Sequence, residues 1–223
     1  MPKRFAIRGI AAVLMAIGLL SSAGSSPAWA GVYVKDLYLK VGYERQIDSR
    51  TCTAAGTAMM LNFIARRDLR LDQAYILRWE QTRDTLDDRV QRGSDPLGWS
   101  RALTNFSSRA GRGTIPYRWE SYGSEATALK HAARVIAERN VPVGLLVAHG
   151  THAMVMSGFE ATSDPRKGDF RLLAVWVSDP NGSTHRRYVA AESPLDTYRE
   201  TDSMYAYYDQ AWYGRFVIVA API

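Results

Sequence analysis

The sequence has 223 residues, and 28 Lys and Arg residues against 22 Asp and Glu residues give it a formal net charge of +6. The basic residues are scattered, without a long run or stripe, which argues against a nucleic-acid-binding surface. There is one cysteine and no CxxC, HExxH, P-loop or dinucleotide-binding motif. The sequence therefore predicts neither a metal site nor a cofactor, and its chemistry has to come from side chains.

Residues 1–30 have the pattern of a signal peptide. Three basic residues precede the apolar run of residues 10–20, and the small-residue motif A-W-A ends at Ala30. The apolar run is shorter than the roughly 20 residues that a membrane-spanning helix needs. We predict export with cleavage after Ala30; an uncleaved anchor is the alternative. Residues 31–223 would form one domain with a net charge of +3, since the three basic residues are lost with the leader.

The first half of the mature segment is predicted to be mostly helical. Aromatic and β-branched residues over Gly31–Tyr43 favour an extended lead-in, and the polar stretch Thr82–Gly93 is typical of a surface turn. Four segments between and after these are rich in helix formers, with apolar residues at helical spacing. The predicted helices are Cys52–Arg66, Asp72–Gln81, Pro96–Ser108 and Ser124–Asn140.

The second half changes character. Short β-branched and aromatic runs, separated by turn residues, predict strands. Helices followed by strands indicate an α+β fold in which N-terminal helices pack on a C-terminal antiparallel sheet. The predicted strands are Val143–Ala148, Ala153–Phe159, Leu172–Ser178 and Phe216–Ala220.

Cys52 is the first candidate for chemistry. Exported proteins generally pair their cysteines, so a single one indicates either an intermolecular bridge or a functional free thiol. Cys52 lies where the coil QIDSRT meets a predicted helix. A helix N-terminus lowers the pKa of a thiol and favours the nucleophilic thiolate. An inert buried cysteine is the alternative interpretation.

A thiol nucleophile needs a base, and the chain has four histidines. His152 opens the predicted strand HAMVMSGFE, where a side chain can project into a cleft, so it is our first candidate. His149, in the preceding loop, is the second. His131, within a predicted helix, and His185, after the DPNGS turn, rank below them. Taken alone, His152 would be a strand histidine bonded to the backbone.

Asp179 is the predicted orienting group for the imidazole. It ends the strand LLAVWVSD and precedes a proline. If its strand and that of His152 are hairpin neighbours, both side chains meet at one edge of the sheet. Asp95 and Asp164 also precede proline but lie in polar loops, and we rank them lower. Taken alone, Asp179 is a good turn starter.

Gln46 is the fourth candidate. A tetrahedral oxyanion needs fixed donors, commonly the backbone N–H of the nucleophile and a side-chain amide. Gln46 lies six residues before Cys52, on the coil that leads into the helix. Taken alone, it would be a surface amide; its position relative to the other candidates makes it an oxyanion-hole candidate.

These residues together carry a resemblance. Gln46, Cys52 at the start of an Ala- and Met-rich helix, and the segments GTHAMVMSGFE and VWVSDPNG resemble papain-like cysteine peptidases. More narrowly, they resemble the bacteriocin-processing (double-glycine) type and its stand-alone exported relatives, over most of residues 43–181. The resemblance implies a papain-like fold in which the cysteine attacks, His152 is general base and acid, Asp179 orients it and the glutamine completes the oxyanion hole. It also implies a peptide or protein substrate, cleaved through a thioester.

Two positions depart from the family pattern. Thr53 follows the cysteine where the family commonly has glycine, and Thr151 precedes His152 where glycine is usual. These departures leave open a non-catalytic secreted binding module on the same fold. The other alternative is a transglutaminase-like acyl transferase, which also runs Cys, His, Asp; the short spacing from Gln46 to the cysteine favours the peptidase. Without an ATPase or transporter segment, a double-glycine leader substrate is not implied.

The aromatic cluster MYAYYDQAWYGRF has two interpretations. Tyr205, Tyr207, Tyr208, Trp212 and Tyr213 could line a substrate groove or form the core and edge of the sheet, and the second is favoured. Beyond a peptide substrate, the sequence predicts no nucleic-acid partner and, after signal removal, no membrane partner. It leaves the oligomeric state open.

Overall fold

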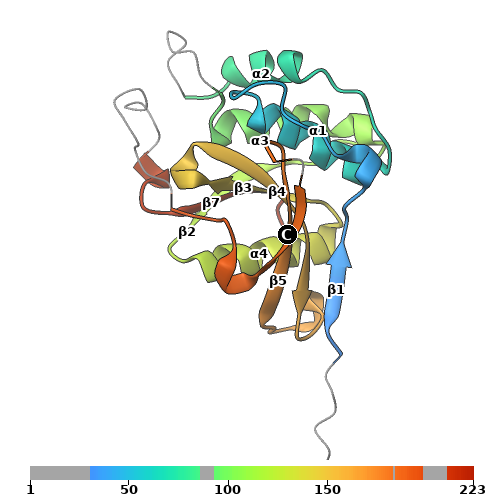
Figure 1. The fold of residues 1–223 in the computed structure, drawn as a ribbon, viewed down its shortest axis with the longest axis vertical. Helices are drawn as coiled ribbons and strands as arrows, with labels where there is room; N and C mark the ends of the chain where they lie inside the picture. The colour runs from blue at the N-terminus through green and yellow to red at the C-terminus, as the bar shows by residue number, and fades with distance from the viewer. Residues whose placement is uncertain (1–30, 86–92, 183, 198–209) are drawn as a thin grey trace, which may run out of the picture. The chain divides into compact units, whose positions relative to one another are not determined.

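The structure is a computed structural model, and it describes residues 31–85, 93–182, 184–197 and 210–223 (Figure 1). The chain divides into two units, residues 1–30 and the remainder, and all described residues belong to the second. The predicted signal peptide therefore lies outside the described residues. Within the described part of the chain, no helix combines the length and the apolar character needed to cross a bilayer.

The four predicted helices are confirmed, with ends within two residues of the expected positions. Three of them start at a side chain that accepts a hydrogen bond from a first-turn N–H: Asp72 from Tyr75, Asp95 from Gly98, and Ser124 from Thr127. Such caps satisfy N–H groups that have no partner inside the helix. The helices are α1 (Cys52–Ala65), α2 (Gln73–Gln81), α3 (Pro96–Phe106) and α4 (Glu125–Arg139).

The described strands form one seven-stranded antiparallel sheet in the order β2-β7-β3-β4-β5-β6, with β1 paired to β4. The expected α+β class is confirmed: helices from the first half pack on an antiparallel sheet that comes largely from the second half. The strands are β1 (Tyr33–Asp36), β2 (Arg118–Tyr122), β3 (Val143–Val147), β4 (His152–Ala161), β5 (Leu172–Asp179), β6 (Thr184–Val189) and β7 (Phe216–Ala220).

The sequence analysis missed two strands, β2 and β6, and these stand at the two ends of the strand order. Neither has a buried residue along its length. An edge strand is held by pairing on one side and carries polar side chains that discourage further pairing. The apolar pattern that marks a central strand is therefore missing from both. Because β2 lies between α3 and α4, the helices do not all precede the strands as expected.

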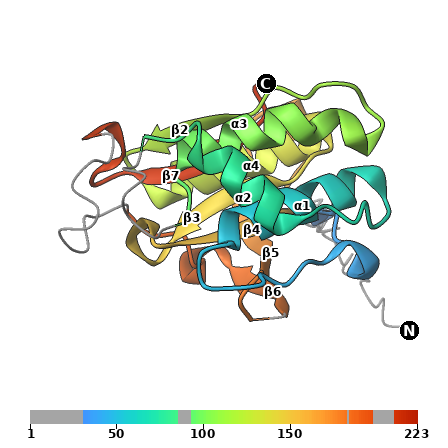
Figure 2. The same cartoon turned by 90° about the horizontal axis from the view of Figure 1, so that it is seen from above.

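The central strands are covered by helices on both faces. Every residue of β3 is buried, as are four of the five residues of β7. The contacts place α1 against β4, α3 against β7 and α4 against β7 and β4. Figure 1 shows α1, α2 and α3 on one side of the central strands and α4 on the other, and Figure 2 shows the first three from above. Buried on all sides, α1 is therefore held in a fixed position relative to β4.

Trp99 of α3 fixes how closely the helices approach the sheet. Its ring is fully buried, and it packs over Gly56 of α1 and Gly144 of β3. A Cβ atom added at Gly144 would lie 2.3 Å from the Trp99 ring, and one at Gly56 would lie 2.9 Å from it. These distances are too short for any side chain, so the indole fills the space that the two glycines leave.

We expect Gly144→Ala to lower the free energy of unfolding by about 1–3 kcal/mol, because the methyl group overpacks the Trp99 ring. Urea unfolding followed by tryptophan fluorescence measures the change. Gly123→Ala is the matched control, since a Cβ there would meet only Arg215, at 3.7 Å. Equal stabilities of the two variants would contradict this account of the packing.

The aromatic cluster near the C-terminus is described only in part. Tyr205, Tyr207 and Tyr208 lie outside the described residues. Trp212 is fully buried and packs edge-on against Trp119 of β2, with ring centroids 5.6 Å apart. At Trp212, the favoured interpretation as sheet core is therefore confirmed.

Candidate active site

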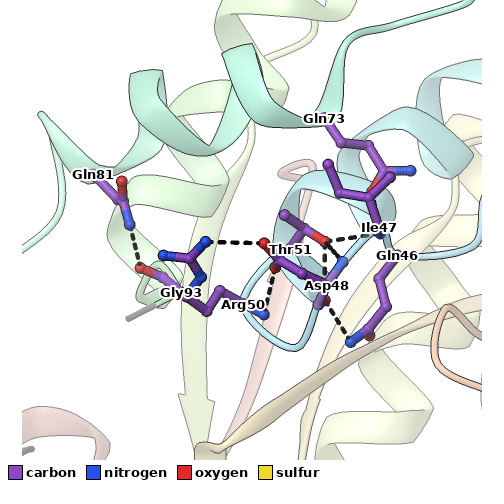
Figure 3. Close-up of polar contacts among 8 residues, drawn as sticks. All are labelled: Gln46, Ile47, Asp48, Arg50, Thr51, Gln73, Gln81 and Gly93. Atoms are coloured by element: carbon purple, nitrogen blue, oxygen red, sulfur yellow. Dashed lines mark hydrogen bonds and ion pairs between the residues drawn. The ribbon is translucent and has the colours of Figure 1, made fainter. Parts of the chain in front are cut away.

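The loop before Cys52 is held together by Thr51 (Figure 3). Its hydroxyl accepts hydrogen bonds from the N–H groups of Ile47 at 3.1 Å and Asp48 at 3.2 Å. The same hydroxyl lies 3.1 Å from the Asp48 carbonyl, to which it donates. Gln73, at the start of α2, accepts a further bond from the Ile47 N–H at 3.2 Å. The loop therefore has a fixed shape where it enters α1.

Helix α1 begins at Cys52 without a side-chain cap, because the Thr51 hydroxyl is engaged in the loop. The first-turn N–H groups are thus left for the nucleophile candidate. The backbone N–H groups of Ala153 and Thr53 lie close enough to the sulfur to oppose the rise of its pKa that burial causes. A helix N-terminus carries partial positive charge, so the position suits a sulfur that ionises during a reaction.

The resting thiol is nevertheless neutral. The Cys52 side chain is buried, with 8% of the residue exposed, and this burial raises the pKa of the thiol to about 11. The hydrogen bonds to the sulfur oppose the rise, and the nearby Glu80 carboxyl adds to it. The expectation of a lowered thiol pKa is therefore wrong for the substrate-free protein, because desolvation outweighs the helix N-terminus. A base has to take the proton before the sulfur can attack.

His152 and Asp179 meet at one end of the sheet. Strands β4 and β5 are antiparallel neighbours with Val155 opposite Ser178, so the start of β4 lies near the end of β5. The His152 Nε2 lies 2.8 Å from the Asp179 Oδ1. Asp179 is held in turn by the N–H of Asn181 at 2.8 Å and, through its backbone carbonyl, by the Tyr43 hydroxyl at 2.6 Å.

The same end of β4 contacts the nucleophile candidate. Ala153, whose N–H reaches the Cys52 sulfur, is the residue next to His152. The bond of His152 Nε2 to Asp179 leaves the Nδ1 nitrogen of the ring for another partner. The structure thus pairs two of the predicted site residues, His152 and Asp179, where β4 begins and β5 ends, and it places the chain neighbour of His152 beside Cys52.

The backbone of Gln46 lies beside the end of β5. Its N–H donates to the Pro180 carbonyl at 3.0 Å, which places it beside the residue that follows Asp179. The side-chain amide, however, donates to the Asp48 carbonyl at 2.8 Å (Figure 3). Its Oε1 is buried and has no hydrogen-bond partner among the described residues. The glutamine is therefore close to the site, with one of its two amide N–H bonds committed to the loop.

Closeness to a carboxylate does not by itself single out His152, because all four histidines have a ring nitrogen within 3.2 Å of one, although those of His131 and His149 make no hydrogen bond there. What distinguishes His152 is the contact of its chain neighbour with the Cys52 sulfur. Asp95 and Asp164, the two lower-ranked aspartates, cap helices instead. The other pairs are His131 with Glu120 at 3.2 Å, His149 with Asp196 at 2.8 Å and His185 with Asp36 at 2.9 Å.

His185 lies in a cluster that has the residue types of a Ser-His-Asp catalytic triad. Its Nδ1 lies 3.2 Å from the Ser178 hydroxyl, and its Nε2 lies 2.9 Å from the Asp36 carboxylate. The ring stacks on Tyr38, at 3.8 Å between centroids, and on Trp176, at 5.3 Å. Ser178 is fully buried, so no substrate can reach its hydroxyl. This cluster fastens β1 and β6 to the sheet, and we assign it no chemistry.

Glu80 is a site neighbour that the sequence analysis missed. It lies on α2, is fully buried, and hydrogen-bonds to the hydroxyls of Thr53 at 2.6 Å and Thr57 at 3.2 Å. Burial raises the pKa of its carboxyl to about 8, the two threonines oppose this, and Asp84 and Asp95 add to it. At neutral pH the carboxyl is therefore mostly protonated.

The Glu80 contact explains why threonine follows the cysteine in this chain. The Thr53 hydroxyl ties the first turn of α1 to α2, which a glycine at that position could not do. A signal for Glu80 was present in the sequence. The buried positions of α2 are 73, 76, 77 and 80, a helical spacing that puts the glutamate on the apolar face.

Comparison with known proteins gives little further guidance. No protein-family model matches the sequence, and no curated protein matches it. Among solved structures, the crystal structure of UfSP from C. elegans is similar at 13% sequence identity, with a TM-score of 0.42. The match covers 91% of this chain but only 36% of that chain. A likeness of this degree assigns no family.

Proposed function

We propose that this protein is an exported cysteine peptidase of the papain-like type, with Cys52 as nucleophile, His152 as general base and acid, and Asp179 as the orienting group. One observation carries the proposal. The 2.8 Å bond between His152 and Asp179 forms at the end of the sheet where the Ala153 N–H meets the Cys52 sulfur. Nucleophile, base and orienting carboxylate in this arrangement are the parts that acyl transfer needs.

The reaction proceeds in two steps. His152 takes the Cys52 proton on Nδ1, while Asp179 holds Nε2 and stabilises the imidazolium that forms. The thiolate attacks the peptide carbonyl, and His152 protonates the leaving amine as the C–N bond breaks, which leaves a thioester. His152 then takes a proton from a water molecule as the water oxygen attacks the thioester carbonyl. The C–S bond breaks, the acid is released, and His152 returns the proton to the sulfur.

The oxyanion would rest on the Cys52 N–H and the Gln46 amide. The helix start leaves the Cys52 N–H uncapped, and the Gln46 amide keeps one N–H besides the one bonded to Asp48. A donor of this kind contributes on the order of 3 kcal/mol to stabilisation of the transition state.

We expect Gln46→Ala to lower kcat by about 100- to 1,000-fold with little change in KM, because the amide acts only after the oxyanion forms. Steady-state hydrolysis of a fluorogenic peptide measures both constants. Gln81→Ala, which removes an amide bonded to the Gly93 carbonyl at 3.4 Å, is the control and should keep full activity. A KM effect with unchanged kcat would contradict the oxyanion role.

The experiment that tests the proposed function is labelling with a thiol-directed peptidyl inhibitor. Because Cys52 is the only cysteine, the mass shift of the intact protein reports it alone. We expect stoichiometric labelling at neutral pH, abolished by His152→Ala and retained by His149→Ala. Labelling of the native protein no faster than that of the unfolded chain would overturn the proposal.

A secreted binding module without catalysis is the second candidate, and the raised pKa of the Cys52 thiol, about 11, favours it. The labelling experiment separates the two. If labelling succeeds, incorporation of an amine in excess of hydrolysis would instead indicate a transglutaminase-like acyl transferase. Export is part of the proposal because of the leader pattern in residues 1–30. N-terminal sequencing of the secreted protein should then begin at Gly31.

A further inference from the structure

One pocket lies away from the candidate active site. It has a volume of about 710 Å³, which falls in the roughly 300–1,000 Å³ range of small-molecule sites. Its lining comes from the end of α2, from α3 and from residues 114–117 ahead of β2, and it includes none of the four predicted site residues. The residues that matter for its chemistry are Trp79, Arg83, Arg101, Thr104, Pro116 and Tyr117.

The charge of this pocket is positive. The Arg83 guanidinium lies over the Trp79 ring, 3.8 Å from its centroid, and Arg101 donates to the Arg83 carbonyl at 2.7 Å. Both side chains are exposed, and within the described residues neither pairs with a carboxylate. The described lining contains no Asp or Glu. One nitrogen of the Arg83 guanidinium, Nη1, donates to the Trp79 carbonyl at 3.3 Å and to the Thr82 hydroxyl. A guanidinium has five N–H donors, so two such groups lining one pocket still match an oxyanion.

Tyr117 forms part of the pocket wall. The residue is 6% exposed, and its hydroxyl is buried without a hydrogen-bond partner among the described residues. The backbone is fixed on both sides, since the Thr104 hydroxyl accepts from the Tyr117 N–H at 2.8 Å and donates to its carbonyl at 3.3 Å. Because the hydroxyl is closed to solvent, Tyr117 contributes a rigid wall and not a ligand contact.

We propose that this pocket binds an organic anion, a carboxylate or phosphate group carried on a ring-sized apolar body. Arg83 and Arg101 would bind the charged group. The apolar body would contact the Trp79 and Pro116 surfaces. The proposal does not depend on peptidase activity, because it uses none of the residues placed in that reaction.

Isothermal titration of the purified protein at constant ionic strength tests this proposal, with benzoate and phenyl phosphate as anionic probes. We expect at least one of them to bind, and benzamide, the neutral match of benzoate, to bind at least tenfold more weakly. The double variant R83Q R101Q should lose at least tenfold in affinity for the anion. R109Q is the matched control and should bind normally, because Arg109 lies over Phe106, 5.7 Å from its centroid, and does not line the pocket.

Inorganic phosphate tests whether the apolar body contributes. Binding of phosphate as tight as that of phenyl phosphate, equal binding of benzamide and benzoate, or no binding of either organic anion would each overturn the proposal.

Discussion

His152→Ala is expected to lower kcat/KM for peptide hydrolysis by about 100- to 10,000-fold, the range that positioned general bases contribute. The loss should be near the upper end, because the Cys52 thiol has a pKa of about 11 and cannot supply its own thiolate at neutral pH. The test is a comparison of kcat/KM for one fluorogenic peptide between the wild type and the variant, from pH 6 to pH 9.

His149→Ala is the matched control for this prediction. His149 also precedes β4 and pairs with a carboxylate, Asp196, at 2.8 Å. If His149→Ala caused the larger loss, the base would be His149 and the assignment of His152 would be wrong. Unfolding in urea should show that both variants stay folded, since both histidine side chains are partly exposed.

The free energy of unfolding of the wild type is expected to fall as pH rises, and the Glu80→Gln substitution is expected to remove this fall. The pKa of Glu80 is raised by burial to about 8 in the folded protein, against an ordinary value of 4.5. Between these two values the unfolded chain has lost the proton and the folded protein keeps it, so stability falls as pH rises from about 4.5 to 8. The fall amounts to roughly 4–5 kcal/mol at most, at 1.36 kcal/mol for each unit of pKa difference.

The measurement is urea unfolding of the wild type and Glu80→Gln at intervals from pH 4.5 to 8.5. Glutamine keeps the size of the side chain, and its amide can accept from one threonine hydroxyl and donate to the other, but it cannot ionise. The free energy of unfolding of the variant should therefore rise relative to that of the wild type as pH rises. Glu138→Gln, at an exposed position on α4, is the control and should follow the wild type. Parallel curves for the wild type and Glu80→Gln would show that Glu80 is ionised throughout.

Glu80 also connects stability with the proposed chemistry. Its carboxyl lies close enough to Cys52 to raise the pKa of the thiol. As Glu80 ionises near pH 8, the negative charge makes thiolate formation harder, while the bond to Thr53 holds the first turn of α1 in place. In the proposed reaction Glu80 would be a positioning residue, and its neutral form is the one that would suit a nucleophilic sulfur.

The sequence by itself determined the local structure. Helix formers and apolar residues at helical spacing marked all four helices, and β-branched runs marked the central strands, because these signals report which face of an element is buried. The same patterns put Cys52 at a helix start, and His152 and Asp179 at strand ends. They failed for β2 and β6, because edge strands bury too little to show an apolar pattern.

Only the tertiary structure decided the environment of those side chains. Each of the four histidines lies beside a carboxylate, the Gln46 amide donates to the Asp48 carbonyl, and packing buries both Cys52 and Glu80. Each pKa shift depends on how much water is excluded and on charges that are distant in sequence, and a local pattern encodes neither. For the same reason, a pocket formed by α2, α3 and the chain ahead of β2 has no sequence signature.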